Sequence, residues 1–182
     1  VLMHRNEQRI RIVPIDVLRT ISMMAVGIDD GHTQRPEAAA QVFSDVDINS
    51  LYAGYIEQLY RSGIITGGGD GKFRPNDNIT VYEAYTMLLN LAGYSRLING
   101  NYPDEVLKAA VKTGLAKGIG TMGSVNVKTA YRMLFNLLEV DVMELSLSEK
   151  DKLKKGAAFM EAVLRVYKGK GVVEAIGGKS LY

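Results

Sequence analysis

The sequence predicts a mainly α-helical protein made of helix–loop–helix repeats, with short β segments and a C-terminal helix plus strand. Three observations support this prediction. Apolar residues recur at helical spacing in several windows of the chain. Glycines follow these windows at the points where a helix would stop. Part of the apolar pattern occurs twice at a constant spacing, which indicates an internal repeat.

The most complete unit is residues 43–94. Its first helix has an apolar face made of Tyr52, Tyr55, Ile56, Leu59 and Tyr60. Gly63 is the predicted end of this helix. The run from Gly67 to Gly71 must turn, because glycine reaches positive φ without steric cost. Thr80 stands three residues before Glu83, which is the spacing of a capping box that opens a second helix. The buried stripe of that helix is predicted to be Val81, Ala84, Tyr85, Leu88 and Ala92.

This order of residues resembles the S-layer homology (SLH) family. The family reads roughly F-x-D-V, a helix, G-I-x-x-G-x-x-D-G-x-F-x-P, and then I-T-R-A-E at the start of a second helix. The matching residues are Phe43, Asp45, Val46, Gly63, Ile64, Gly67, Asp70, Gly71, Phe73, Pro75, Ile79, Thr80 and Glu83. The resemblance implies three repeats packed around a pseudo-threefold axis, in an extracellular protein of the cell wall or surface layer.

Two other stretches resemble shortened forms of the same unit. In residues 14–42, Pro14 suits the first turn of a helix, and Gln34 to Glu37 resemble the T-R-A-E segment. In residues 102–140, Pro103 opens a helix with the apolar residues Val106, Leu107, Ala110 and Val111, and Gly114 closes it. A second helix face is predicted from Val127, Ala130, Tyr131, Leu134 and Leu138. The internal repeat consists of Ala84-Tyr85, Met87-Leu88 and Asn90-Leu91, which recur as Ala130-Tyr131, Met133-Leu134 and Asn136-Leu137.

The chain is therefore divided into four parts. Residues 1–42 are an N-terminal arm with a shortened repeat, 43–95 a complete repeat, 96–145 a degenerate repeat, and 146–182 a linker helix followed by the start of a β-hairpin. The linker helix is predicted to begin at Ser148 and to be lined by Leu153, Ala157, Met160, Val163, Leu164 and Tyr167. A similar YKGKGVV phrase precedes a β-rich region in clostridial-type SLH proteins. A terminal strand without a partner invites pairing with another chain.

Composition narrows the class of protein. The chain has 182 residues, of which 47% are hydrophobic, enough for one sizeable core or a few small repeats. The net charge of +2 predicts no strong attraction to nucleic acid or membrane, although a basic arm over residues 1–13 leaves a polyanion contact as an alternative to a solvated arm. The absence of cysteine excludes disulfides and thiolate metal sites. The apolar runs are too short to span a bilayer. A start without Met or an apolar leader predicts a processed or truncated product.

Catalysis and cofactor binding are not predicted. His4 and His32 have no sequence partner typical of a catalytic site. The segment around Lys179 lacks the glycine that begins a phosphate loop, because Val173 stands at that position. The Asp70 to Asp77 segment lacks the alternating oxygen ligands and the final Glu of a calcium loop, which favours a structural turn and no metal.

The resemblance implies non-covalent anchoring to secondary cell-wall polymer, often pyruvylated. Such a site needs cationic and hydrogen-bonding groups together with an aromatic face. Leu51 stands at the family's Trp position and Val81 at its Arg position, and a missing guanidinium removes bidentate carboxylate recognition. Only the shortened repeat keeps the Arg, and Arg74 or Lys72 are substitutes in the complete repeat. The predicted glycan-binding residues are Arg35, Asp45, Gly67, Gly68, Gly69 and Arg74.

Two functions follow from these residues. The first is a non-catalytic cell-surface module that anchors a secreted protein to wall polymer. The alternative is a structural subunit of a surface layer, filament or other assembly, in which the fold is a scaffold and glycan binding has decayed. The missing Trp and Arg and the terminal strand favour the alternative, whereas the match from Phe43 to Glu83 favours the first.

Overall fold

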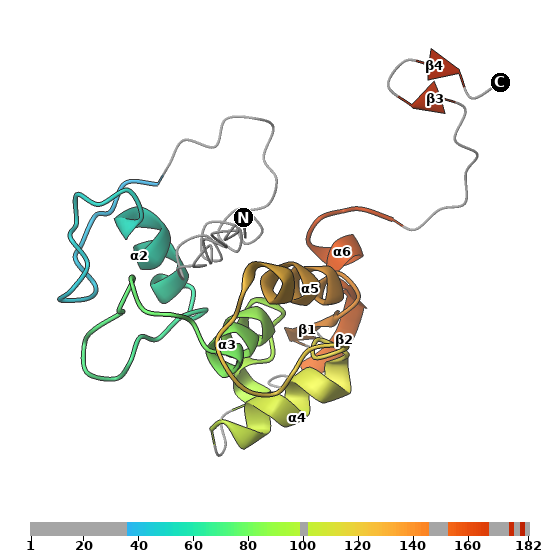
Figure 1. The fold of residues 1–182 in the computed structure, drawn as a ribbon, viewed down its shortest axis with the longest axis horizontal. Helices are drawn as coiled ribbons and strands as arrows, with labels where there is room; N and C mark the ends of the chain where they lie inside the picture. Colours follow the sequence, from blue (N-terminus) through green and yellow to red (C-terminus); the bar gives the residue numbers. More distant parts are fainter. Residues whose placement is uncertain (1–35, 99–101, 146–152, 168–174, 177–178, 181–182) are drawn as a thin grey trace, which may run out of the picture.

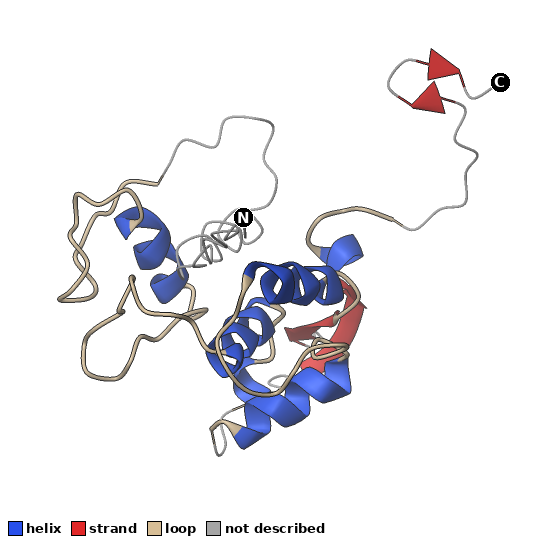
Figure 2. Ribbon diagram, viewed as in Figure 1, coloured by secondary structure: helices blue, strands red, loops and turns tan. Residues whose placement is uncertain are grey.

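The fold, seen in a computed structural model that describes residues 36–98, 102–145, 153–167, 175–176 and 179–180, is mainly helical (Figures 1 and 2). This confirms the predicted class. Its elements are α2 (Ala53–Arg61), α3 (Val81–Leu91), the 3-10 helix η1 (Ser95–Leu97), α4 (Asp104–Thr113), α5 (Val127–Leu137), β1 (Asp141–Leu145), β2 (Leu153–Ala158), α6 (Phe159–Ala162), β3 (Ala175–Ile176) and β4 (Lys179–Ser180). Most of the predicted first repeat, including Arg35, lies outside the described residues, so the threefold arrangement stays a prediction.

Helix α3 begins where the capping box predicts. The Thr80 Oγ1 accepts a hydrogen bond from the Glu83 amide at 3.2 Å, and the Glu83 carboxylate accepts one from the Thr80 amide at 2.7 Å. These two bonds satisfy amides that the first turn of a helix leaves without partners. The buried residues of the helix are Val81, Ala84, Tyr85, Leu88 and Leu89, and Ala92 follows at its end. The predicted stripe of α3 is confirmed.

The units α2–α3 and α4–α5 repeat one tertiary contact. The Asn90 side-chain amide in α3 donates to the Ile64 carbonyl at 3.1 Å, just after α2 ends. The Asn136 side-chain amide in α5 donates to the carbonyls of Leu115 and Lys117, both at 2.9 Å, just after α4 ends. The Asn-Leu pairs recognised in the sequence are therefore equivalent positions, each of which ties the second helix of a unit to the loop that follows the first.

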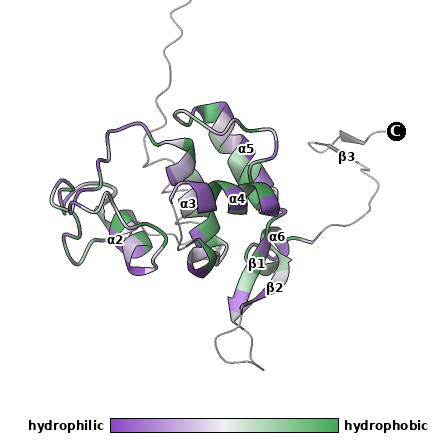
Figure 3. Cartoon of the chain, turned by 90° about the horizontal axis from the view of Figure 1, so that it is seen from below, coloured by the Kyte–Doolittle hydropathy of each residue, from purple (hydrophilic) through white to green (hydrophobic). Residues whose placement is uncertain are grey.

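The two units meet along the start of α3. The Val125 amide donates to the Ile79 carbonyl at 2.9 Å, and the Val81 amide donates to the Gly123 carbonyl at 3.0 Å. Thr80 and Ser124 thus form an isolated antiparallel bridge. Around this junction α3, α4 and α5 lie together beside the β1–β2 pair, and each helix carries both hydrophilic and hydrophobic stretches (Figures 1 and 3). The largest fully buried side chains are Tyr85, Phe159, Ile56, Leu59, Leu88, Leu89, Leu115, Met133, Leu137 and Val106.

The segment before α2 is held by one buried carboxylate. Glu57, on α2, accepts hydrogen bonds from the amides of Ala39 at 2.6 Å and Ala40 at 3.2 Å. Arg61, one turn further along, donates to the same carboxylate at 2.7 Å. The hydrogen bond from Arg61, together with those from the backbone, holds the pKa of Glu57 below its ordinary value. The end of the predicted first repeat is thereby attached to α2.

Tyr85 allows a test of how a buried hydroxyl without a partner affects the stability of the core. Its side chain is fully buried, its hydroxyl has no hydrogen-bond partner among the described residues, and burial raises its pKa. A buried unpaired hydroxyl costs about 1–3 kcal/mol in desolvation. We expect Tyr85→Phe to raise the free energy of unfolding by about 1 kcal/mol, measured by urea denaturation. Tyr94→Phe is the matched control, because the Tyr94 hydroxyl donates to the Asp141 carbonyl at 2.9 Å. Equal losses in both variants would contradict the expectation.

The buried face of α5 differs from the predicted one. Ala130, Met133, Asn136 and Leu137 are buried, whereas Tyr131 is 70% exposed. The predicted face is therefore wrong at Tyr131. The physical reason is Asn136, because its two hydrogen bonds to the preceding loop turn that side of the helix inward.

The predicted linker helix from Ser148 to Tyr167 is also wrong in its described part. Residues 153–158 form β2, which pairs antiparallel with β1, and α6 contains only Phe159–Ala162. Gly156 weakens a helix in the middle of this segment by about 1 kcal/mol relative to Ala. In the strand it lies against Glu144 and Val142, where a Cβ would come within 2.7 Å and 2.9 Å of their side chains. The pairing of this segment with β1 thus outweighs the helical spacing of its apolar residues.

The last described residues form a second small hairpin. Strand β3 pairs antiparallel with β4, with Ala175 opposite Ser180 and Ile176 opposite Lys179. The sequence predicts a hairpin around Gly177 and Gly178, which lie outside the described residues. Because β3 has a partner within the chain, the interpretation that it must pair with another chain loses part of its support.

Candidate functional site

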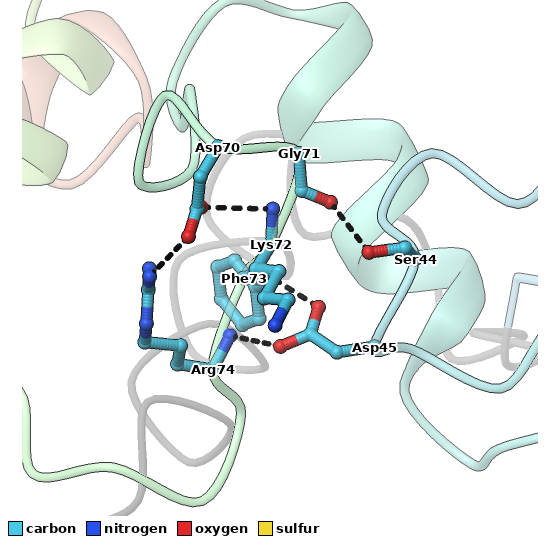
Figure 4. Close-up of polar contacts among 7 residues, drawn as sticks. All are labelled: Ser44, Asp45, Asp70, Gly71, Lys72, Phe73 and Arg74. Carbon is cyan, nitrogen blue, oxygen red and sulfur yellow. Dashed lines mark hydrogen bonds and ion pairs between the residues drawn. The ribbon is translucent and has the colours of Figure 1, made fainter.

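Asp45 supports the glycine-rich loop from the segment before α2 (Figure 4). One carboxylate oxygen accepts a hydrogen bond from the Phe73 amide and the other from the Arg74 amide, both at 2.8 Å. Beside it, the Ser44 amide donates to the Gly71 carbonyl at 2.9 Å. Burial alone would raise the pKa of Asp45, but the backbone hydrogen bonds, with a contribution from the positive charge of Lys72, hold it below its ordinary value.

This geometry predicts a pH-dependent contribution of Asp45. A carboxyl with a lowered folded-state pKa stabilises the fold above its unfolded pKa, and the contribution is lost as pH falls through the folded pKa. An asparagine would place an amide donor against one of the two backbone N–H groups. We expect Asp45→Asn to lower the free energy of unfolding at pH 7 by only about 1 kcal/mol, because the carboxylate is exposed. Below about pH 4 the same substitution is expected to lower the free energy of unfolding by less.

Urea denaturation of both proteins from pH 7 to pH 2 tests this expectation. The matched control is Asp47→Asn, because the Asp47 carboxylate accepts a local hydrogen bond from the Asn49 amide at 2.9 Å, two residues away. If the free energies of unfolding of wild type and Asp45→Asn differed by the same amount at every pH, the stabilising role assigned to the Asp45 carboxylate would be contradicted.

Arg74 is held over the loop by Asp70. Its guanidinium forms an ion pair with the Asp70 carboxylate, which also accepts a hydrogen bond from the Lys72 amide at 3.2 Å (Figure 4). Burial acts to raise the pKa of Asp70, but the Lys72 and Arg74 hydrogen bonds hold it below its ordinary value. Arg74 has a φ of 58°, which is uncommon for a residue other than glycine, and residues in this conformation cluster at functional sites.

Gly67 and Gly68 are the two glycines of the loop with other atoms close to them. The φ of Gly67 is +72°, and a Cβ there would come within 2.4 Å of the Phe43 ring and 3.0 Å of the Lys72 carbonyl. At Gly68 a Cβ would meet the Arg74 guanidinium at 2.2 Å. Gly69, with a φ of +79°, has open space around it. Both the close Phe43 ring and the positive φ require glycine at position 67, and the positive φ requires it at position 69. At position 68 the close group is the end of the flexible Arg74 side chain, which can move aside.

A cleft of about 520 Å³ opens between this loop, the start of α3 and the connector before α4. Its volume falls in the roughly 300–1,000 Å³ range of small-molecule sites. The lining residues are Ile64, Ile65, Thr66, Gly67, Gly68, Phe73, Arg74, Asp77, Asn78, Ile79, Thr80, Glu83, Thr86, Met87 and Tyr102. The cleft combines aromatic faces, hydroxyl and amide groups and backbone N–H groups, which is a suitable surface for a polar ring compound.

Three of the predicted site residues line the cleft, namely Gly67, Gly68 and Arg74. Asp45 holds the loop from outside this lining, and Gly69 lies at the turn beside it. Arg35 lies outside the described residues. The structure thus brings together one part of the predicted set, and the role of each residue in glycan binding stays a proposal.

Sequence reasoning missed Tyr102, which reaches the cleft from the connector between the two units. The only signal was its place just before Pro103, where the third repeat begins. At the two positions where the sequence departs from the family pattern, Leu51 is 70% exposed and Val81 is 3% exposed.

A capping box and a braced glycine loop between two helices define a small helical repeat module. Residues 42–80 match the S-layer homology domain. The chain is similar to the "Middle cell wall protein" of Brevibacillus brevis, 27% identical over 126 residues that cover 69% of this chain and 12% of the relative.

Two further relatives agree with this match. The "Surface layer protein" of Brevibacillus choshinensis is 29% identical over 103 residues, 56% of this chain and 9% of the relative. The "Cell surface protein" of Thermoanaerobacter kivui is 32% identical over 77 residues, 42% of this chain and 10% of the relative. The chain thus spans about a tenth of the length of these proteins. The predicted extracellular location, at the cell wall or surface layer, is confirmed.

Two further features are absent from the described part of the chain. No helix there has the length and apolarity needed to cross a membrane. The same residues contain no group of three or more His, Cys, Asp or Glu side chains placed to hold a metal ion.

Proposed function

We propose that this chain is a non-catalytic module that anchors a longer surface protein to secondary cell-wall polymer. The observation that carries the proposal is the position of the cleft. It is lined by the glycine loop, which belongs to the segment 42–80 that matches the S-layer homology domain, and by the start of α3, which follows that segment directly. Asp45, Asp70 and the capping box hold this surface in place before any ligand binds. A preorganised surface loses less entropy on binding.

Sedimentation with isolated cell walls tests the proposal. We expect the chain to pellet with intact walls and to stay in solution when the secondary polymer has been extracted from them. A variant with the loop disrupted, Gly67→Ala, is expected to lose binding. Gly114→Ala serves as a control for general damage, because Gly114 ends α4 in the other unit with a φ of +84° and has open space around it. Recovery of the wild-type chain in the supernatant of intact walls would overturn the proposal.

A structural subunit is the second candidate function. It is favoured by the exposed side of α5, where Tyr131 is 70% and Phe135 is 64% exposed beside Lys128 and Arg132. Exposed aromatic residues next to cations are common in protein contacts. In this case we expect a concentration-dependent increase in mass by analytical ultracentrifugation, which Phe135→Ser would reduce. A monomer at all concentrations would exclude this function for the isolated chain.

A further inference from the structure

Acidic and basic side chains are segregated between the two helical units. Residues 36–60, which contain α2, include four acidic residues and no Lys or Arg, so their net charge is −4. Residues 106–138, which contain most of α4 and all of α5, include five basic residues and no Asp or Glu, so their net charge is +5. Helices α2 and α5 lie on opposite sides of α3 in both views (Figures 1 and 3). The helical body thus has an acidic end and a basic end.

The basic end carries an exposed aromatic surface on α5, called here the α5 face. Its members are Lys128, Tyr131, Arg132 and Phe135, which recur at the i, i+3, i+4 and i+7 spacing of one side of a helix. Both aromatic side chains are mostly exposed, and all four residues line a groove of about 710 Å³. Neither Lys128 nor Arg132 has an ion-pair partner within the described residues. The α5 face therefore offers apolar area and positive charge that the described fold leaves uncovered.

The acidic end carries a complementary surface in the turn that precedes α2. This acidic turn, residues 47–51, places Asp47 beside two exposed apolar side chains, those of Ile48 and Leu51. The Ser50 amide donates to the Asp47 carbonyl at 2.9 Å, and the Asn49 amide donates to the Asp47 carboxylate at 2.9 Å. These bonds order the turn in advance, so less entropy is lost on binding. The acidic turn thus combines apolar area and charge as the α5 face does, but with the opposite sign.

We propose that the acidic turn of one copy of this chain binds the α5 face of a second copy. In this contact Ile48 and Leu51 pack against the two aromatic rings, and the Asp47 carboxylate lies near the two cations. Two identical surfaces of this kind repel each other, whereas two unlike surfaces attract. The inference rests on the structural-subunit function proposed above, and it names the surfaces through which the subunits meet.

The positions of the two surfaces determine the form of the assembly. Because the surfaces lie at opposite ends of the helical body, a copy that is bound through its acidic turn keeps its own α5 face open. Such a head-to-tail contact is heterologous, so it adds copies in a row or closes them into a ring. One turn against one side of a helix is a small interface, which makes the contact weak and dependent on concentration.

Sedimentation velocity of the whole chain at increasing concentration tests the contact. We expect reversible association into species larger than a dimer. We also expect the dissociation constant to rise about fivefold or more between about 50 mM and 500 mM salt, because salt screens the attraction between opposite charges. Association that stops at a dimer and does not respond to salt would overturn the inference but not the structural-subunit function. Monomers under all conditions would overturn both.

Charge reversal tests which surfaces meet. Asp47→Lys reverses the acidic turn, and a double variant with Lys128→Glu and Arg132→Glu reverses the α5 face. We expect each variant alone to associate at least about tenfold more weakly than wild type, because surfaces of like charge then face each other. An equimolar mixture of the two is expected to associate again, because each turn meets an α5 face of opposite charge. If the mixture stays as weak as its components, the assigned pairing is wrong.

Leu51→Ser tests the apolar part of the contact. We expect it to weaken association about tenfold, as is typical of an anchor residue in an interface. Leu97→Ser is the matched control, because Leu97 is 52% exposed on η1 and belongs to neither surface. Circular dichroism checks that both variants are folded. Equal association of Leu51→Ser and wild type would show that the subunits meet through other surfaces.

An anionic wall polymer is the competing occupant of the α5 face. Sedimentation of both charge-reversal variants with isolated cell walls separates this occupant from a second copy. We expect both variants to pellet as the wild type does, because the α5 face lies outside the cleft lining. If the double variant on α5 alone lost wall binding, the α5 face would be a polymer site and the inference would fail.

Discussion

Gly67→Ala is expected to lower the free energy of unfolding by about 2–4 kcal/mol and to abolish wall binding. Two costs add at this position. The φ of +72° strains any residue with a Cβ, and that Cβ would come within 2.4 Å of the Phe43 ring. Phe43 is buried and also packs on Phe73, with ring centroids 5.5 Å apart, so the ring cannot move aside without disturbing the core. The loop is therefore expected to leave its position beside the cleft.

Gly69→Ala separates these two costs. Its φ of +79° is close to that of Gly67, but a Cβ there would meet nothing within 4 Å. We expect a loss of about 1 kcal/mol from backbone strain alone, with wall binding largely kept. Urea denaturation and wall sedimentation of both variants make the comparison. Equal losses of stability in the two variants would show that contact with Phe43 contributes nothing.

Asn136→Ala is expected to lower the free energy of unfolding by about 2–4 kcal/mol, because it leaves two carbonyls of the preceding loop without their donor. The side chain is 7% exposed, and water can replace its bonds to Leu115 and Lys117 only at the cost of opening the site. The buried face of α5 depends on this residue. We therefore expect a loss of cooperativity in the 102–140 unit as well, visible as a lower m-value in urea.

The comparison variant is Asn90→Ala in the equivalent position of α3. The Asn90 side-chain amide donates one hydrogen bond, to the Ile64 carbonyl. The side-chain oxygen of Asn90, Oδ1, is buried without a partner among the described residues. Removing the side chain costs one bond but also removes one unsatisfied group, so we expect a loss of about 1 kcal/mol. A larger effect at Asn90 than at Asn136 would contradict the assignment of these two contacts.

The elements predicted best are those whose signals are local. The capping box at Thr80 and Glu83 and the stripe of α3 depend on residues three or four apart, which lie next to one another in any helix. Gly63 and Gly114 end their helices with φ values of +70° and +84°. The resemblance to the S-layer homology family rests on the same local signals, and the match over residues 42–80 confirms it.

The elements predicted wrongly depend on partners distant in the sequence. The spacing of Leu153, Ala157 and Met160 fits a helix, but strand β1 offers hydrogen bonds that this segment accepts as β2. The buried face of α5 could not be predicted from the residues of α5 alone, because the partners of Asn136 lie in a loop about twenty positions before Asn136. Periodicity records which side of an element is apolar, but not which backbone groups elsewhere need a donor.

The sequence by itself determined the helix pair, the glycine loop and the class of surface module, because their signals are carried by neighbouring residues. The tertiary structure alone decided how the loop becomes a site. It placed Asp45 against the amides of Phe73 and Arg74, and it brought Tyr102 to the cleft lining from the next unit. These contacts join residues far apart in the chain, and a hydrogen bond or a ring contact depends on distances that only the folded chain establishes.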